Sequence, residues 1–264
     1  MGNTNEYFGG IAEGEPLYQV VAFKMKHIIR TPEQLAAAIY DSYSKGYNPD
    51  DGTTVKGRKN MGDYEWVNRP GTTKAVVNGE EVEQINSEDK FVIGYSVPHS
   101  TGGFSNTFRY KGLSLNVYLD WAIGHTIRHA QMARQFINTF TGNTALNAGV
   151  LDTWSPQNPD AKYARFYSGG ESVSANFKND SDVFAFKGDY LCIRELSLAW
   201  DLPKKFVSKL GMQGASITLA GNNLHYFTAV PGVSPEVGTM STNAAGYNNY
   251  PPIRRISLGI KVIF

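Results

Sequence analysis

The sequence predicts an all-β fold: an antiparallel transmembrane β-barrel segment of about six strands, with long loops that contain short helices. The first observation is the alternation in the last ten residues, where one parity is apolar: Ile256, Leu258, Ile260, Val262 and Phe264. Successive side chains of a strand point to opposite faces, and a barrel strand in a membrane needs one apolar and one polar face. The second observation is an alternation of very short and very long connections between the expected strands.

Composition excludes several classes of protein. The chain has 264 residues and a formal net charge of +1, which gives no reason to expect a nucleic-acid partner. No run of 18 apolar residues could form a transmembrane helix, and a barrel would not contain one. The single cysteine, Cys192, excludes an internal disulfide bond. Residues 1–7 have neither the basic nor the apolar region of a secretory signal, so we expect the chain to be the end of a longer one.

The first half of the chain contains one strand, one helix and one hairpin. Pro16–Lys24 is the first expected strand. Thr31 is the expected N-cap of a helix with proline at the first position and glutamine at the third, which is a capping-box pattern. Phe104–Tyr110 and Leu113–Trp121 alternate on either side of Lys111-Gly112, which predicts a tight hairpin.

The second half continues with three strands. Ile127–Phe140 has helical periodicity, and Asp189–Leu202 alternates as a long strand. Pro203–Gly211 has proline at its start and glycine at its end, as expected of a short helix. Ala215–Asn222 and the last segment are the remaining strands.

The spacing of these strands favours a barrel over a sandwich. Long connections fall at about 24–102, 125–187 and 225–252, and they alternate with short ones. Short periplasmic turns and long extracellular loops are typical of outer-membrane barrels. If the chain ends at the periplasmic rim, Tyr110, Trp200 and Phe264 lie near that rim as an aromatic girdle. The alternative is that these three aromatic side chains pack a soluble core.

Ordered sequence blocks resemble the carboxy-terminal end of SusC/RagA-like TonB-dependent outer-membrane transporters of Bacteroidetes. The blocks are Ile11–Leu17, Leu151–Tyr163, Lys187–Phe206, Ala220–Leu224, Pro231–Gly238 and Tyr250–Arg254, followed by the terminal Phe264. The segment Tyr64–Gly71 departs from the family, because Arg69 and Pro70 stand where the family often has oxygen donors. That departure puts an inherited calcium loop in doubt.

The resemblance implies a 22-stranded barrel around an amino-terminal plug. Residues 1–264 would be the carboxy-terminal portion of the barrel, with plug, TonB box and signal peptide absent, because six strands are too few to close a barrel. It also implies location in the cell outer membrane and a set of partners: a SusD-like lipoprotein, the missing amino-terminal barrel and plug, TonB-ExbB-ExbD acting through that plug, and the barrel-assembly machinery.

Candidate chemistry is sparse. His125 and His129 stand four apart on an expected helix, but no third ligand is evident, so no metal site is predicted. No catalytic arrangement stands out, and neither an enzyme nor a cofactor is expected. Aromatic loop residues are the candidates for substrate contact, with loop packing as the alternative: Trp154, Tyr163, Phe166, Tyr167, Tyr226, Phe227, Tyr247 and Tyr250.

The sequence therefore indicates part of a TonB-dependent importer of oligosaccharides or peptides, which supplies barrel wall and extracellular loops for substrate and lid. Two rivals stay open. One is a soluble or surface glycan-binding β protein, and the other is a non-functional fragment of a split transporter gene.

Overall fold

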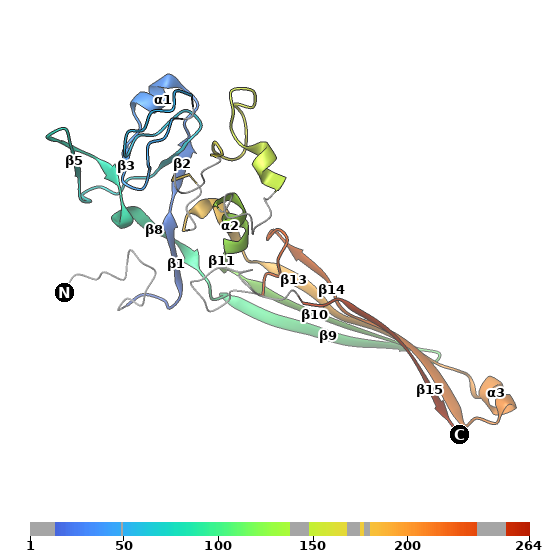
Figure 1. Ribbon diagram of the computed structural model, residues 1–264. Helices are drawn as coiled ribbons and strands as arrows, with labels where there is room; N and C mark the ends of the chain where they lie inside the picture. The colour runs from blue at the N-terminus through green and yellow to red at the C-terminus, as the bar shows by residue number, and fades with distance from the viewer. Residues whose placement is uncertain (1–13, 49, 138–147, 168–174, 177–179, 237–251) are drawn as a thin grey trace.

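The structure is a computed structural model that describes residues 14–48, 50–137, 148–167, 175–176, 180–236 and 252–264. A long twisted sheet extends from a packed layer of loops, which we call the cap (Figure 1). The sheet elements are β9 (Ser100–Tyr110), β10 (Leu113–Ile123), β13 (Tyr190–Asp201), β14 (Gly214–Thr228) and β15 (Arg255–Ile263), with α3 (Lys204–Val207) and the 3₁₀ turn η5 (Ser208–Leu210) at its far end.

The cap contains the other described elements. They are β1 (Gln19–Phe23), β2 (Met25–Ile28), α1 (Pro32–Ala36), β3 (Tyr40–Asp41), β4 (Tyr64–Trp66), β5 (Ala75–Val77), β6 (Glu80–Val82), β7 (Gln84–Ile85), η1 (Ser87–Asp89), β8 (Lys90–Tyr95), β11 (Thr126–Arg128), α2 (Ala130–Ile137), η2 (Ala148–Asp152), η4 (Asp182–Phe184) and β12 (Ala185–Lys187). No described helix is long and apolar enough to cross a membrane.

The sheet is antiparallel and has the order β15-β14-β13-β10-β9. The predicted hairpin is confirmed, with Tyr110 opposite Leu113. Its two turn residues, Lys111 (φ 46°) and Gly112 (φ 83°), both adopt positive φ angles. Two positive φ angles define the turn whose twist matches that of the flanking strands. The final strand is also confirmed, as β15.

One face of the sheet is apolar across all five strands. Register places Tyr110, Leu113, Trp200, Ile217 and Ile260 in one cross-strand row, and Phe108, Leu115, Leu198, Leu219 and Leu258 in the next. Leu219 and Leu258 are 51% and 69% exposed. No residue of this face belongs to the hydrophobic core of the described chain, so the apolar rows are uncovered.

The opposite face is polar or small. Arg109, Ser114, Ala199, Thr218 and Gly259 form one row on it. In the neighbouring row, Thr107 Oγ1 donates to Asn116 Oδ1 (2.7 Å), and Asn116 Nδ2 donates to Ser197 Oγ (3.1 Å). The alternation predicted from single strands therefore holds in these rows across all five strands.

Three sequence expectations about elements need correction. The first strand forms as β1, but it pairs with β8, so the large sheet has five strands where six were expected. All five residues of β1 are buried, which shows that it belongs to the cap core. The helix expected from Ile127 begins only at Ala130, because Thr126–Arg128 pairs with β12 as β11. β14 extends to Thr228, beyond its expected end at Asn222.

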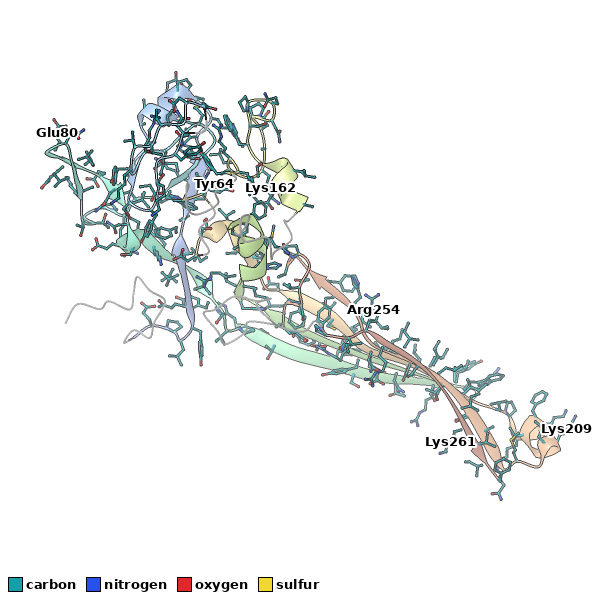
Figure 2. The ribbon with its side chains drawn as sticks, in the orientation of Figure 1. Tyr64, Glu80, Lys162, Lys209, Arg254 and Lys261 are labelled. Atoms are coloured by element: carbon teal, nitrogen blue, oxygen red, sulfur yellow. The ribbon has the colours of Figure 1, made fainter. Side chains whose placement is uncertain are left out.

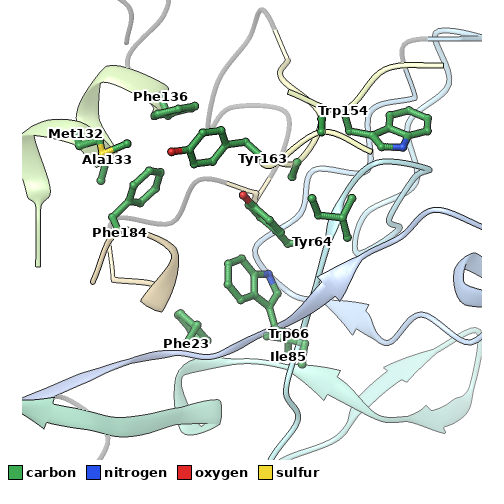
Figure 3. Close-up of a cluster of buried hydrophobic side chains, with 13 residues drawn as sticks. Phe23, Tyr64, Trp66, Ile85, Met132, Ala133, Phe136, Trp154, Tyr163 and Phe184 are labelled. Atoms are coloured by element: carbon green, nitrogen blue, oxygen red, sulfur yellow. The ribbon is translucent and has the colours of Figure 1, made fainter. Parts of the chain in front are cut away.

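The cap is held together by an aromatic core (Figure 3). The ring centroid of Trp66 lies 6.1 Å from that of Phe23 and 5.4 Å from that of Tyr64. Phe136 lies 4.8 Å from Tyr163, again between ring centroids. Such pairs add about 0.5–1.5 kcal/mol beyond the burial of their area. The long connections thus fold into a packed layer of their own at one end of the sheet.

The predicted capping box of α1 is confirmed. Gln34 N donates to Thr31 Oγ1 (3.3 Å), and Thr31 N donates to Gln34 Oε1 (3.2 Å). The helix is short and ends at Ala36.

Candidate functional site

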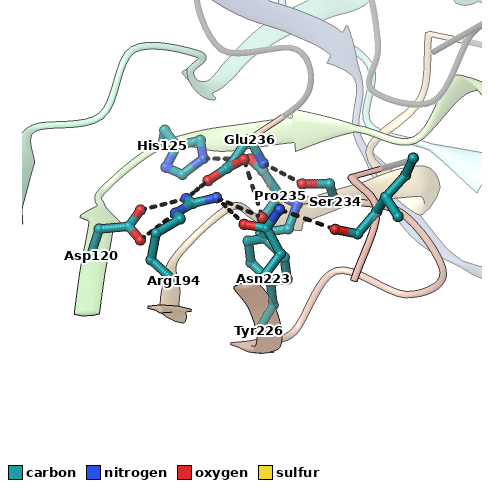
Figure 4. A network of polar contacts seen from close by, with 9 residues as sticks. Asp120, His125, Arg194, Asn223, Tyr226, Ser234, Pro235 and Glu236 are labelled. Atoms are coloured by element: carbon teal, nitrogen blue, oxygen red, sulfur yellow. Dashed lines mark hydrogen bonds and ion pairs between the residues drawn. The ribbon is translucent and has the colours of Figure 1, made fainter. Parts of the chain in front are cut away.

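A charged cluster lies where the polar face of the sheet meets the cap (Figure 4). Its centre is Arg194, the residue at which the pairing register of β13 shifts. On β14, Asn223 has a φ angle of 50°, and the pairing likewise skips from Asn222 to His225. A bulge changes the direction of a side chain and is frequent beside functional sites. Here it directs Arg194 onto the polar face.

Arg194 is held by partners on the two neighbouring strands and on the segment that follows β14. Its Nε and Nη2 donate to the two carboxylate oxygens of Asp120 on β10, at 2.8 and 2.7 Å. Its Nη1 donates to Asn223 Oδ1 (2.8 Å) and to the hydroxyl oxygen of Tyr226 (3.2 Å) on β14. Nη2 also contacts Glu236, which follows β14. The two-pronged pairing with Asp120 fixes the guanidinium plane, because both groups are planar forks.

The segment Val230–Glu236 is fastened over this cluster. Glu236 Oε2 accepts from the Tyr226 hydroxyl (3.2 Å), and Pro235 is fully buried. His129 Nε2 lies 2.9 Å from the carbonyl oxygen of Pro231, and His125 Nε2 lies 3.4 Å from that of Pro235. The segment is therefore held by one charged side chain and by two histidine rings.

The histidines are structural donors in this arrangement. His129 Nδ1 accepts from Met132 N (3.2 Å), so the ring is neutral with its proton on Nε2. Burial lowers the pKa of both His125 and His129 below the ordinary value. The expected common helix was wrong: His125 precedes β11, and His129 precedes α2. Within the described ranges, no group of three or more His, Cys, Asp or Glu residues could hold a metal ion.

A second polar network lies inside the cap around Asp63, which is buried. Tyr167 Oη (2.8 Å) and Asn176 Nδ2 (2.8 Å) donate to Asp63 Oδ1, and Asn60 N donates to Oδ2 (2.7 Å). Desolvation raises the pKa of Asp63, although these donors oppose the shift. Sequence reasoning missed this network because Asn176 is 113 residues away from Asp63.

The aromatic residues predicted to contact substrate fall into three groups. Trp154, Tyr163 and Tyr167 are buried, and Phe166 is half-buried against the same core. Substrate contact by these four rings stays a prediction. Tyr226 belongs to the Arg194 cluster. Phe227 is 54% exposed on the opposite, apolar face, where it pairs with Leu191. Tyr247 and Tyr250 lie outside the described residues. Among the candidates that lie on described strands, Tyr226 is on the polar face of the sheet and Phe227 is on the apolar face.

The three residues predicted as a membrane girdle lie at the end of the sheet away from the cap. Tyr110 and Trp200 share one cross-strand row, and Phe264 follows β15 on the apolar parity. They are 68%, 43% and 82% exposed.

Comparison with known proteins identifies relatives of this chain. The chain is 31% identical over 197 residues to TonB-dependent receptor P26 of Formosa agariphila. The matched region covers 71% of this chain and 19% of that protein. It is 26% identical over 230 residues to TonB-dependent receptor P3 of the same organism, covering 84% of this chain and 21% of that protein. The chain therefore spans about a fifth of the length of the curated relatives it matches. No protein-family model matches it.

Solved structures share the fold. The RagAB peptide transporter structure matches with a TM-score of 0.61 and 20% identity, over 92% of this chain and 22% of that chain. An open-open state of the RagAB peptide importer matches with a TM-score of 0.60 and 19% identity, over the whole of this chain and 24% of that chain.

Proposed function

We propose that this chain, which is SusC/RagA-like in sequence and fold, forms part of the wall and the outer loops of a TonB-dependent importer in the outer membrane. The observation that carries the proposal is the continuous apolar face of the five-stranded sheet, uncovered in the described structure. A soluble protein would bury such a face against a second layer, and a barrel turns it to lipid.

The two edges of the sheet support the same proposal. β9 and β15 each pair on one side only among the described strands. Open edges are not tolerated in hydrocarbon, so further strands must complete the wall. The strands have 9 to 15 residues, and a tilted membrane crossing takes about 9–11.

The orientation follows from the connections. The β9–β10 turn and the β13–β14 connection lie at the rim with Tyr110 and Trp200, and the cap lies at the other rim (Figure 1). We assign the short connections to the periplasm and the cap to the cell exterior.

The cap would then contact substrate and a SusD-like lipoprotein lid. Oligosaccharides and peptides are the substrate classes we propose, and peptide is the class named for the RagAB relative. Transport energy would come from TonB-ExbB-ExbD through a plug, and the barrel-assembly machinery would recognise β15. Tyr226, on the polar face at the foot of the cap, is the aromatic residue of the sheet best placed for the substrate.

Fractionation and uptake in the source bacterium test this function. The polypeptide that contains this chain should appear in the outer membrane, migrate faster on a gel before heating than after it, and purify with a lipoprotein. Deleting its coding region should abolish uptake of one labelled oligosaccharide or peptide pool. Recovery of the polypeptide in a soluble fraction would contradict the proposal.

A further inference from the structure

The connection between β13 and β14 carries an exposed apolar and basic surface at the rim opposite the cap. Phe206 and Leu210 are 63% and 73% exposed, whereas Val207 between them is buried against the protein. Both exposed side chains thus project from one short connection and form its apolar surface. Lys204, Lys205 and Lys209 are exposed on the same connection.

The charge of this rim is one-sided. The two short connections contain four exposed lysines and no acidic residue: Lys111, Lys204, Lys205 and Lys209. Asp201, at the end of β13, precedes the second connection. In the described structure, none of the three lysines of the α3–η5 connection has an ion-pair partner. Figure 2 shows Lys209 at the tip of the molecule, beyond the end of the sheet.

The basic surface continues the apolar face of the sheet. Trp200, on the apolar face, is the last residue but one of β13, and α3 begins three residues after the end of that strand. At the other short connection, Lys111 Nζ lies 5.1 Å from the centre of the Tyr110 ring. Exposed apolar side chains next to lysines, at the margin of a lipid-facing surface, suit the boundary between acyl chains and headgroups.

We propose that the α3–η5 connection is a lipid-binding foot. Phe206 and Leu210 insert beside the acyl chains of the phospholipid leaflet at this rim, and Lys204, Lys205 and Lys209 bind anionic phosphate headgroups. This inference rests on the proposed function, because it needs the sheet to lie in a membrane. Each lysine near an anionic membrane surface strengthens binding roughly fivefold.

Fluorescence quenching by brominated phospholipids tests the foot in the full-length receptor. Trp121 and Trp200 lie on the apolar face and report whether the sheet contacts lipid. Phe206→Trp adds one indole on the foot, and its quenching is the difference between the variant and the wild-type protein. Vesicles contain phosphatidylcholine with phosphatidylglycerol, and either lipid carries the bromine. We expect quenching at the foot, with brominated phosphatidylglycerol favoured by about fivefold or more.

A charge-matched pair of variants tests the lysines. In Phe206→Trp, adding Lys204→Gln, Lys205→Gln and Lys209→Gln should bring the preference for phosphatidylglycerol close to one. The control adds Lys45→Gln, Lys56→Gln and Lys162→Gln, which remove the same charge from the cap and should leave the preference unchanged. Gel migration before and after heating verifies that each variant is folded.

The remaining outcomes separate the inference from the proposed function. If Trp121 and Trp200 are quenched by lipid but the indole of Phe206→Trp is not, the foot is overturned and the barrel wall stands. If that indole is shielded from aqueous acrylamide as well, a protein partner covers the surface. Equal quenching by both lipids would overturn the role of the lysines. If no tryptophan of the sheet is quenched, the proposed function itself fails.

Discussion

Replacing Ile256 by lysine tests which face of the sheet contacts hydrocarbon. Ile256 lies on β15 opposite Gly221, and it is four residues from Ile260 in the row of Tyr110 and Trp200. At about 3.3 Å per residue, four residues cover about 13 Å along the strand. A tilt of about 40° reduces this to about 10 Å along the membrane normal, within an apolar band about 25 Å tall.

That depth is close to the middle of the band. A lysine facing lipid there costs about 2–4 kcal/mol, and one facing the lumen costs far less. We therefore expect Ile256→Lys to lower the folding equilibrium constant by roughly thirtyfold to nearly a thousandfold. Ser257→Lys is the matched control, because it is the next residue on the same strand and belongs to the polar face.

The assay is denaturant unfolding of the full-length receptor in lipid vesicles, followed by tryptophan fluorescence. In water the same change would be nearly neutral, because Ile256 is already 70% exposed in the described chain. The lipid-facing assignment is refuted if Ile256→Lys is as stable as Ser257→Lys, or more stable than it.

Three further predictions concern the cap. Burial lowers the pKa of His129, so this ring binds a proton more tightly when segment 230–236 is detached from it than when the segment is in place. The contribution of His129 to holding the segment is therefore full above about pH 6.5 and is lost as the pH falls. Hydrogen exchange of the segment's amides, corrected for the intrinsic rate, should accelerate on acidification, and an unchanged rate would contradict this. Thr31→Ala removes the N-cap of α1 and should lower local stability by about 1 kcal/mol, measured by exchange in that helix against Thr31→Ser as control. Tyr167→Phe removes a donor from the buried carboxyl of Asp63 and should destabilise the cap by about 1–3 kcal/mol in denaturant titrations; a loss below a few tenths would show that the hydroxyl contributes nothing.

The sequence was sufficient for the strands of the sheet, because each carries its own alternation. The Lys111-Gly112 turn and the capping box at Thr31 are equally local, and both are confirmed. The parity of Leu198 or Leu258 says which side of the strand is apolar, and a barrel wall needs little more.

Local alternation could not predict which segments fold into the cap. The β1 strand looks like a barrel strand in sequence, but its neighbours are β8 and residues 180–182, brought together from distant parts of the chain. The burial of Trp154 and Tyr163 depends on the same long-range packing, which no local sequence pattern shows. The bulge at Arg194 interrupts the alternation locally, and no sequence rule placed Glu236 against it.

The path of the chain through the cap constrains the order of disassembly. Phe23 N donates to Asp180 O (2.9 Å), and Tyr64 N donates to Asn176 Oδ1 (3.0 Å). In each bond one partner precedes the β9–β10 hairpin and the other lies between β10 and β13, so each bond closes a loop of chain that contains the hairpin. The segment before the hairpin can therefore leave the connection between β10 and β13 only after both bonds have broken.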